Sequence, residues 1–476
     1  MLLSRPDVPR PSAQAADKAR RLLERSLGPS KVLTSEEACA RFANDESEAE
    51  GAVPAAVVMA ENADDILAAL AAASESEVPI TPRAGGTGRT GGAVPVAGGI
   101  VLATAGMSQI KEIDRREGIA VVGPGVVLGE LHAAVEREGW FYPPDPNSLG
   151  TCCLGGNVAE NAGGPRAFKY GVTREYVLGM EAFLIGGQRL QVGRRTMKGV
   201  TGYDVTGLLV GSEGTLAVFG DLTLQLIPKP EGVMTLLSLF PGVQQAGVAV
   251  EKMVERGLVP RCLEFLDGDT LNAMRAAGNA IDARAGSMLL LEVDGDAHAV
   301  ERQAERVGEA CSDSGALEVL VAQDASQRDR LWSARREMTY AVRKLAKRKL
   351  SEDVVVPRKR IGELLERVSE IGARHRIHTL SYGHAGDGNL HVNFLWNDDA
   401  EIPQVSRAIE DMFKAVVAMR GTLSGEHGIG VLKAPYLGLE QSSDLIALQQ
   451  QLKRVFDPRG LLNPGKIFPA GSHRAC

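Results

Sequence analysis

The chain has 476 residues and a net charge of −7, with 53 lysines and arginines against 60 aspartates and glutamates. Its 44% hydrophobic and 24% charged residues are typical of a globular protein, and its length predicts two or three domains. The acidic balance and the 4% aromatic content argue against nucleic acid as a partner. No apolar run approaches the roughly 18 residues of a transmembrane segment.

In chain order, short strands dominate the first half of the sequence. We expect there a helix over 14–27, a strand over 55–59, a helix capped by Asn62, a strand ending at Pro82, strands in GGIVLAT and GIAVVGPGV, and a helix over 128–138. After Pro230, strands alternate with helices. The elements expected there are strands in MTLLSLF, CLEFLD, SMLLLEVDG, DVVVP and TLSYGHAGDGNLHVNFLW, and helices over 243–256, 297–314, 331–349, 360–374 and 440–455. This alternation indicates an α+β fold with a boundary near residue 228.

The cysteines and the N-terminus bear on the compartment. Six cysteines without a CxxC spacing are too few for a disulfide framework, which favours a reducing, cytoplasmic location. The opening MLLSRPDVPRPS is interrupted by Arg5, Pro6 and Pro9, so it does not predict a signal peptide. The basic residues within 1–31 leave an organelle transit peptide as an alternative, and a peripheral place on a membrane is another.

Glycine is concentrated in a few places. Of 54 glycines, 20 lie in the stretches 83–99, 150–171, 383–388 and 421–430. The first stretch contains a GxGxxG pattern from Gly86 to Gly91, but Pro95 and a strand follow it instead of a helix, so we reject a nicotinamide-binding Rossmann fold. Its backbone N–H groups can still bind a diphosphate, and a flexible surface loop is the alternative.

The second glycine-rich stretch favours a ligand site. Residues 143–173 contain few large apolar groups, and this stretch is too long for a loop without a function in a compact domain. Asn157 and Asn161 offer amide contacts, and the glycines allow close backbone approach.

Six motifs in order span residues 82–466: PRAGGTGRTGG, PDPNSLGTCCLGGNVAENAGGPRAFKYG, LLVGSEGTLAV, GHAGDGNLH, SGEHGIG and FDPRGLLNPGK. Together they resemble the FAD-dependent D-2-hydroxy acid dehydrogenases, which are the D-lactate, glycolate and D-2-hydroxyglutarate dehydrogenase group of the vanillyl-alcohol-oxidase-type (VAO/PCMH) flavoproteins. The resemblance implies a two-lobed FAD-binding domain over 1–228, an α+β substrate domain over 229–420, and a C-terminal segment over 421–476 that returns to the FAD domain.

The resemblance also implies the FAD contacts. The pyrophosphate would be held by Pro82, Arg83, Gly85, Gly86, Thr87, Gly88, Thr90 and Gly91. The flavin would be lined by Pro144, Asp145, Thr151, Gly155, Gly156, Asn157, Asn161, Gly164 and Gly171, with Glu213, Gly214 and Val218 on the adenine side and Asn463 reaching the flavin from the C-terminus. Some related flavoproteins attach FAD covalently through a histidine in or near the first loop, but this chain has none there, and His132 is the nearest. Cys152 and Cys153 could attach FAD by their position, but they are better explained as small apolar residues. We therefore expect non-covalent FAD.

Histidines cluster in the C-terminal part of the chain. His378, His384, His391 and His427 fall within fifty residues, and the Gly-Asp-Gly turn after His384 can fold it toward His391. Two histidines and a carboxylate form an open divalent-metal site, for zinc in the first place and for manganese or iron as alternatives. Metal-free, hydrogen-bonded histidines are the other interpretation. By resemblance, His384, His391 and Glu426 are metal ligands and His427 is the catalytic base.

The substrate carboxylate needs a fixed cation. Arg335 and Thr339 lie four residues apart on one helix face and match family positions that hold this carboxylate, although a solvated basic helix is an alternative. Asn393 shares a strand face with His391 and is counted among the catalytic residues. Relatives that act on D-2-hydroxyglutarate carry a lysine where this chain has Ser351, two residues before Asp353. A monocarboxylate is therefore favoured, unless Lys349 substitutes.

The predicted function is FAD-dependent oxidation of a D-2-hydroxy acid, D-lactate in the first place, to the 2-oxo acid. The alternatives are a D-2-hydroxyglutarate dehydrogenase, a glycolate oxidase subunit, a non-catalytic flavin electron-transfer subunit and a zinc hydrolase. The expected partners are a small 2-hydroxy acid and an electron acceptor, which is a quinone, a cytochrome or an electron-transfer flavoprotein. A homodimer is a further possibility.

Overall fold

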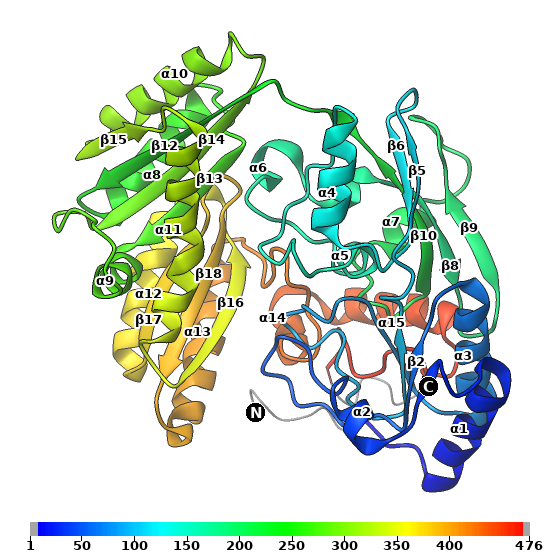
Figure 1. Cartoon of the computed structure of the whole chain (residues 1–476). Helices are drawn as coiled ribbons and strands as arrows, with labels where there is room; N and C mark the ends of the chain where they lie inside the picture. Colours follow the sequence, from blue (N-terminus) through cyan, green and yellow to red (C-terminus); the bar gives the residue numbers. More distant parts are fainter. Residues whose placement is uncertain (1–7, 470–476) are drawn as a thin grey trace. The chain divides into compact units, whose positions relative to one another are not determined.

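The computed structural model describes residues 8–469, without the side chains of residues 334, 336 and 337. The described residues therefore exclude Arg5, Pro6 and Cys476, the side chain of Arg336, and the first residues of the alternative transit peptide. Two compact units form along the chain (Figure 1). Among the described residues, the two-sheet unit comprises 8–162, 172–229 and 426–469, and the seven-stranded unit comprises 163–171 and 230–425. No helix among residues 8–469 is long and apolar enough to cross a membrane.

The first sheet of the two-sheet unit has the strand order β1-β2-β4-β3. These strands are β1 (Val32–Leu33), β2 (Ala56–Met59), β4 (Ile100–Ala103) and β3 (Ile80–Arg83). Strands β2, β4 and β3 are parallel. Strands β2 and β4 are wholly apolar, as expected for strands that are covered on both faces, whereas β3 also contains Thr81 and Arg83. The covering helices are α1 (Ala13–Leu27) and α3 (Ala63–Ser76), with the short α2 (Glu36–Ala40) nearby in sequence. Asn62 caps α3 as expected, because its Oδ1 accepts from the N–H groups of Asp64 and Asp65.

The second sheet of this unit has the order β5-β6-β10-β8-β9. Its strands are β5 (Ile110–Asp114), β6 (Ile119–Val122), β10 (Val218–Gln225), β8 (Val177–Phe183) and β9 (Arg189–Gly193), and β7 (Trp140–Phe141) pairs separately with β11 (Ile227–Pro228). The helices here are α4 (Leu128–Arg137), α5 (Leu154–Glu160), α7 (Val205–Leu209) and the 3₁₀ turn η1 (Thr173–Tyr176).

The end of the chain returns to the first sheet. Its elements are η4 (Ala434–Tyr436), α14 (Leu437–Glu440) and α15 (Ser443–Phe456). Ile80 in β3 donates to the carbonyl oxygen of Leu461 at 2.8 Å, and the Asn463 N–H donates to the Ile80 carbonyl oxygen at 2.8 Å. The motif FDPRGLLNPGK is thereby joined to the strand that leads into the first glycine-rich loop.

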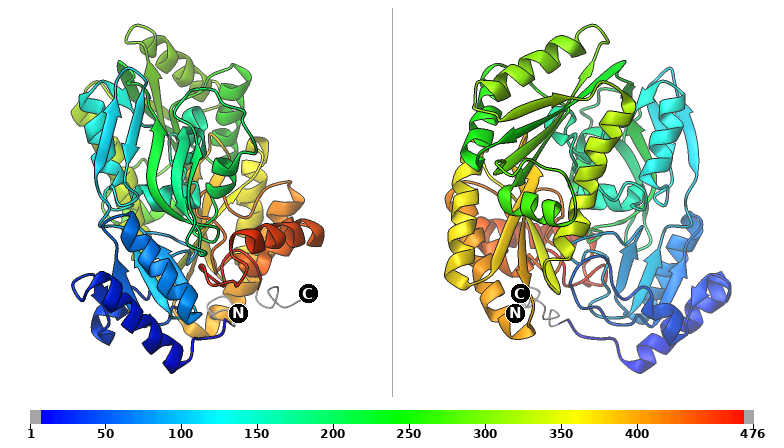
Figure 2. Two further views of the ribbon diagram at one scale, coloured as in Figure 1. Left: turned by 90° about the vertical axis from the view of Figure 1, so that its right-hand side faces the viewer. Right: turned by 60° about the vertical axis from the view of Figure 1, so that its left-hand side comes forward.

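The seven-stranded unit contains one antiparallel sheet of order β15-β12-β14-β13-β17-β18-β16. Its strands are β15 (Glu318–Val321), β12 (Gly232–Phe240), β14 (Ser287–Gly295), β13 (Cys262–Asp267), β17 (His378–His384), β18 (Asn389–Trp396) and β16 (Arg348–Val355). One face is covered by α8 (Val243–Glu255), α10 (Val300–Ser312), α12 (Ile361–His375) and α13 (Ile402–Ala418). The other is covered by α9 (Gly268–Ala276) and α11 (Ala325–Arg343) (Figure 2, right). The remaining pieces are α6 (Ala167–Tyr170), η2 (Arg358–Arg360) and η3 (Asp399–Glu401).

Three expectations about local structure were wrong or incomplete. The helix expected over 331–349 begins at Ala325, because Asp324 caps it, and ends at Arg343; Arg348 and Lys349 already pair with β18. Within the stretch 143–173 the chain forms α5 and α6, two short helices that were not anticipated. Helices α9 and α13 and strand β15 were not anticipated.

Candidate active site

The register of the seven-stranded sheet brings polar side chains together under α11. Tyr382 lies opposite His391 in the β17–β18 hairpin, and His384 lies opposite Asn389. Directly opposed residues of antiparallel strands point to the same face, so the two histidines are diagonal neighbours on one face. Their rings lie 5.3 Å apart between centroids and are almost perpendicular, at 86°. Both side chains are buried.

Glu426 completes a group of three metal-ligand types. One ligand atom from each of His384, His391 and Glu426 lies within 4.8 Å of the others. Glu426 directly follows Gly425, whose N–H donates to Asp353 Oδ2 at 2.7 Å. Asp353 faces His391 from β16 and is fully buried. The strand register and this hydrogen bond therefore explain why a residue 35 positions further along the chain reaches the histidines. Nitrogen and carboxylate donors in this set fit a divalent cation.

Glu264, which the sequence reasoning missed, orients the first histidine. It lies opposite His384 from β13, and its Oε1 is hydrogen-bonded to His384 Nδ1. This leaves Nε2 as the ring atom for a metal, the arrangement in which a carboxylate fixes the orientation of a ligating histidine. Burial raises the pKa of Glu264, but the positive charges of His384 and Arg335 outweigh it and hold this pKa below its usual range.

Arg335 is paired with Glu264 in this structure. Its Nε and Nη2 donate to Glu264 Oε2 at 3.0 and 2.8 Å, and its guanidinium lies 5.3 Å from the centre of the Tyr382 ring. The arginine is buried, which argues against the solvated basic helix as its role. Thr339, one turn further along α11, is half-buried.

Lys349 lies on the same face of β16 as Ser351. Ser351 is opposite Asn393, and Lys349 Nζ donates to Asn393 Oδ1 at 2.8 Å and to the Tyr382 hydroxyl at 3.3 Å. One of these partners is an amide and the other a hydroxyl, so neither is a carboxylate. Burial by itself raises the pKa of Tyr382, but Lys349 and Arg335 lower it below its usual range. Asn393 Nδ2 donates to the His391 carbonyl oxygen at 3.0 Å, so the amide is fixed within the hairpin.

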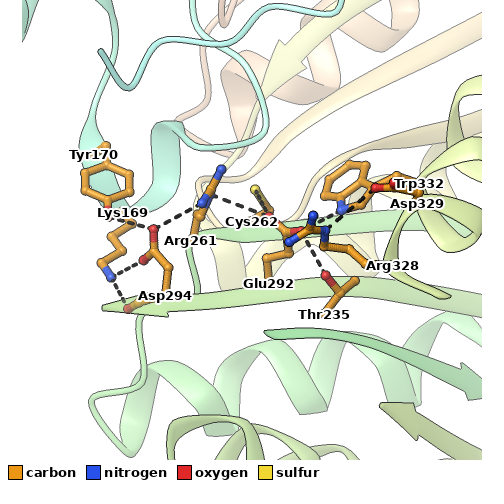
Figure 3. Close-up of polar contacts among 10 residues, drawn as sticks. All are labelled: Lys169, Tyr170, Thr235, Arg261, Cys262, Glu292, Asp294, Arg328, Asp329 and Trp332. Carbon is orange, nitrogen blue, oxygen red and sulfur yellow. Dashed lines mark hydrogen bonds and ion pairs between the residues drawn. The ribbon is translucent and has the colours of Figure 1, made fainter. Parts of the chain in front are cut away.

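A second polar network extends this face toward the edge of the sheet (Figure 3). Trp332 Nε1 and Thr235 Oγ1 donate to Glu292 Oε1 at 2.7 and 2.8 Å, and Arg261 lies between Glu292 and Asp294, 3.5 Å from a carboxylate oxygen of each. Trp332 and Arg335 are three residues apart in α11, so both attach this helix to buried carboxylates of the sheet.

The short helix α6 is attached to the same unit. Asp294 accepts from Lys169 Nζ and from the Tyr170 hydroxyl, the latter at 2.8 Å. The side chain of Phe168 packs on Gly386 in the turn between the two histidine strands, where an added Cβ would lie 2.5 Å from Phe168 Cγ. Gly164 and Gly171, assigned to the flavin by resemblance, lie on either side of α6, with φ of 142° and 78°.

In the two-sheet unit, the glycine-rich loops press against one another. A Cβ on Gly85 would lie 2.9 Å from the Thr151 carbonyl oxygen and 3.1 Å from the Cys153 nitrogen. Gly86 has φ of 68°, and the Arg83 guanidinium lies where its side chain would be. Only glycine allows this approach of two backbones, which is the feature that a diphosphate cradle requires.

The segment that carries His427 is fixed to the first glycine-rich loop. Thr90 Oγ1 donates to the His427 carbonyl oxygen at 2.9 Å. Glu213 accepts from the N–H groups of Ile429 at 2.8 Å and Gly430 at 2.7 Å. Asn463 Nδ2 donates to the Glu213 carbonyl oxygen at 2.8 Å. Three separate motifs of the sequence therefore meet around the backbone of residues 427–430.

The other residues assigned to FAD occupy varied positions. Gly155, Gly156 and Asn157 lie in α5, and a Cβ on Gly155 would lie 2.7 Å from Pro124 Cβ, which explains a glycine in a helix there. Asn161 ends α5 in the left-handed region and accepts from the Arg174 N–H. Pro82 lies within β3 and Val218 begins β10. The remaining members are in loops: Thr87, Gly88, Gly91, Pro144, Asp145, Thr151 and Gly214. His132 is hydrogen-bonded to the Pro144 carbonyl oxygen at 2.9 Å, and Cys152 and Cys153 are buried.

Comparison with known proteins agrees with this architecture. Residues 54–193 match the family described as FAD binding domain, and residues 229–467 match FAD linked oxidases, C-terminal domain. Fold and family define an FAD-linked oxidoreductase. The chain belongs to the FAD-linked oxidases, and its resemblance to their D-2-hydroxy acid dehydrogenase group is confirmed.

Two relatives and one solved structure illustrate the similarity. The chain is 40% identical to the glycolate oxidase subunit GlcD of Bacillus subtilis (strain 168), over 87% of this chain and 89% of that protein. It is 33% identical to a D-lactate dehydrogenase of Anaerostipes hadrus, over 93% and 96%. The structure of p-cresol methylhydroxylase with substrate bound matches with a TM-score of 0.81 at 14% identity, over 98% of this chain and 100% of that chain. This last match confirms the VAO/PCMH-type fold.

Proposed function

We propose that this protein oxidises a D-2-hydroxy acid, D-lactate or a similar monocarboxylate, to the 2-oxo acid. The observation that carries the proposal is the convergence of His384, His391 and Glu426, together with FAD-linked relatives named for D-lactate and glycolate. A metal-free pair of core histidines would not need the carboxylate of Glu426 beside them.

The residues divide the chemistry between them. The glycine-rich loops would hold FAD, which would supply the acceptor for the hydride of the substrate Cα. A divalent cation on His384, His391 and Glu426 would act as a Lewis acid on the substrate hydroxyl. His427 follows the third ligand in the chain and would take the hydroxyl proton, an effect typically of order 10²–10⁴-fold. Thr90 holds the His427 carbonyl oxygen and so restricts the backbone of this base.

Two cations are candidates for the substrate carboxylate. Arg335 offers a planar guanidinium, but Glu264 already accepts from it. Lys349 donates to the Tyr382 hydroxyl and to the Asn393 amide oxygen, and neither of these two partners is a carboxylate. We propose that the carboxylate binds Arg335 and that Thr339 and Asn393 complete its polar surroundings.

The position of Lys349 favours a second candidate substrate class. A lysine on this face could bind a second carboxylate even though Ser351 occupies the place at which a lysine was expected for D-2-hydroxyglutarate. A 2-hydroxy dicarboxylate would then be oxidised by the same residues.

Anaerobic flavin reduction tests the proposal. The purified flavoprotein is mixed with D-lactate, L-lactate, glycolate and D-2-hydroxyglutarate, and the flavin absorbance is followed. We expect bleaching by a D-2-hydroxy acid, its loss after chelation and in His427→Ala, and an unchanged flavin content in both cases. Preference for the dicarboxylate that disappears in Lys349→Met would select the second class.

Two results would contradict the proposal. Normal reduction after chelation and in His427→Ala would exclude the metal and the base. No reduction by any acid, in a protein that still accepts electrons from an artificial reductant, would assign it to a non-catalytic electron-transfer subunit. The natural electron acceptor is identified separately, by comparing the rates at which a quinone, a cytochrome and an electron-transfer flavoprotein reoxidise the reduced flavin.

A further inference from the structure

The loop over residues 194–204, which joins β9 to α7 (Figure 1), presents apolar side chains to solvent. We call it the β9–α7 loop. Every residue in it is exposed. Met197 is 61% exposed, and Val200 and Tyr203 are each 98% exposed. Apolar side chains gathered on one exposed segment mark a site of interaction.

The space inside the β9–α7 loop is taken by a polar side chain. Arg194 Nε donates to the Thr196 carbonyl oxygen at 3.1 Å, and Arg194 Cδ lies 2.7 Å from the position that a Cβ on Gly199 would take. Thr196 Oγ1 donates to the Lys198 carbonyl oxygen at 2.7 Å. The loop is therefore ordered by its own polar contacts, and its apolar side chains are left on the outside.

Tyr203 departs from a local packing rule. Asp204 caps α7, since its Oδ1 accepts from the Gly207 N–H at 2.8 Å. A large apolar residue directly before such a cap ordinarily packs on the residue four positions after the cap, which is Leu208 here. Tyr203 is 98% exposed and Leu208 is 37% exposed, so Tyr203 does not make this contact. A local rule that is broken without a gain inside the fold is a sign of function.

The β9–α7 loop is positively charged. No acidic residue occurs between Glu181 and Asp204, and this stretch contains four basic residues in a chain of net charge −7: Arg189, Arg194, Arg195 and Lys198. Arg189 pairs with Glu181, Arg195 pairs with Glu112 of β5, and Asp204 is engaged as the cap of α7. Arg194 and Lys198 have no carboxylate partner in the part of the chain that the structure describes. These two cations are therefore available to an anionic surface.

We propose that the β9–α7 loop attaches this protein to an anionic lipid bilayer. Lysine and arginine are attracted to acidic headgroups, tyrosine favours the level of the headgroups, and methionine and valine enter the acyl boundary below them. A bilayer accepts apolar side chains one by one, whereas a protein partner needs a continuous face of about 800 Å². Gly199 and Gly202 interrupt this loop, which favours the bilayer. The proposal is independent of the substrate and of the metal.

Co-sedimentation of the flavin-loaded full chain with lipid vesicles tests the proposal. We expect binding to vesicles of equal parts phosphatidylcholine and phosphatidylglycerol, and at least about tenfold weaker binding to phosphatidylcholine alone. Val200→Ser/Tyr203→Ser should lower the affinity for the acidic vesicles by more than about tenfold. Lys198→Gln should lower it by roughly fivefold, the effect of one basic residue near such a surface. Because all three side chains are exposed, the flavin content and melting temperature should not change.

Val259→Ser/Tyr340→Ser is the matched control. It removes the same two kinds of side chain from positions outside the loop, where Val259 is 47% exposed and Tyr340 is 69% exposed. This variant should bind the acidic vesicles like the wild type. Fluorescence gives a direct measure of insertion: the emission of Tyr203→Trp should shift to shorter wavelength when acidic vesicles are added, relative to the wild type, and that of Tyr340→Trp should not.

Three results would overturn the proposal. The first is a wild-type chain that stays in the supernatant with acidic vesicles. The second is full binding by Val200→Ser/Tyr203→Ser, and the third is an equal loss of binding in the control variant. A wild type that binds neither kind of vesicle, but forms dimers that Val200→Ser/Tyr203→Ser abolishes, would assign the loop to an interface between two copies of the chain instead.

Discussion

Replacing Glu264 by glutamine should weaken metal binding more than any other single change outside the ligands. Glu264 is fully buried and accepts from Arg335 Nε, Arg335 Nη2 and His384 Nδ1. Glutamine has the same shape but only one acceptor oxygen, so its amide N–H₂ must face either the arginine or the histidine. Removing one member of a buried ion pair costs about 3–5 kcal/mol of stability. Loss of a carboxylate that orients a ligating histidine lowers metal affinity by about 10- to 100-fold.

Glu292→Gln separates the two effects. Glu292 is also buried, on the adjacent strand, and accepts from Trp332 and Thr235, but it does not contact the histidines. Both variants should unfold at a lower temperature than the wild type. In a competition with a chelator of known affinity, only Glu264→Gln should lose zinc more readily. Equal zinc affinities in the two variants would refute the role of Glu264 in orienting His384 for the metal, because Glu264 would then contribute only to the stability of the fold.

Three further predictions concern the cofactor loops and pH. Gly85→Ala should lower the ratio of flavin to protein, because its Cβ would lie 2.9 Å from the Thr151 carbonyl oxygen, whereas Gly150→Ala, with nothing within 4 Å, should not; equal ratios would contradict the cradle. FAD should appear in the supernatant after acid precipitation, and flavin that stays with the pellet would contradict non-covalent binding. Burial raises the pKa of Asp267 from 3.8 to about 6. Between pH 4 and 6 this carboxyl is therefore protonated in the folded chain but ionised in the unfolded chain, and the free energy of unfolding falls as the pH rises through this range. An asparagine at this position cannot ionise, so the free energy of unfolding of Asp267→Asn should rise relative to that of the wild type by up to ~3 kcal/mol between pH 4 and 6. The difference in melting temperature between the two proteins should therefore grow with pH. A difference that stays constant would contradict this pKa.

Local patterns were enough to predict some elements and not others. Asn62 before an apolar helix and the Gly-Asp-Gly turn between two apolar strands carry their signal within a few residues, so α3 and the β17–β18 hairpin were foreseen. The expected helix over 331–349 overran its end because lysine and arginine favour helices, whereas pairing with β18 makes Arg348 and Lys349 part of a strand.

Long-range register explains what sequence reasoning missed. Glu264 stands in CLEFLD, an apolar strand with one acid, and only the pairing of β13 with β17, 120 residues away, sets it opposite His384. Gly155 and Gly156 disfavour a helix intrinsically, yet both lie in α5, where a side chain at position 155 would collide with Pro124. Neither contact leaves a trace in the spacing of neighbouring residues.

The path of the chain through α6 limits how this enzyme can be divided or recombined. Residues 163–171 belong to the seven-stranded unit although the chain before and after them belongs to the other unit. A polypeptide of residues 230–425 alone would lack Lys169 and Tyr170, the partners of the buried Asp294, and Phe168, the cover of the Gly386 turn. Exchange of substrate specificity between relatives by a single crossover near residue 229 would join a foreign α6 to this sheet. Successful chimeras should therefore carry both segments from one parent.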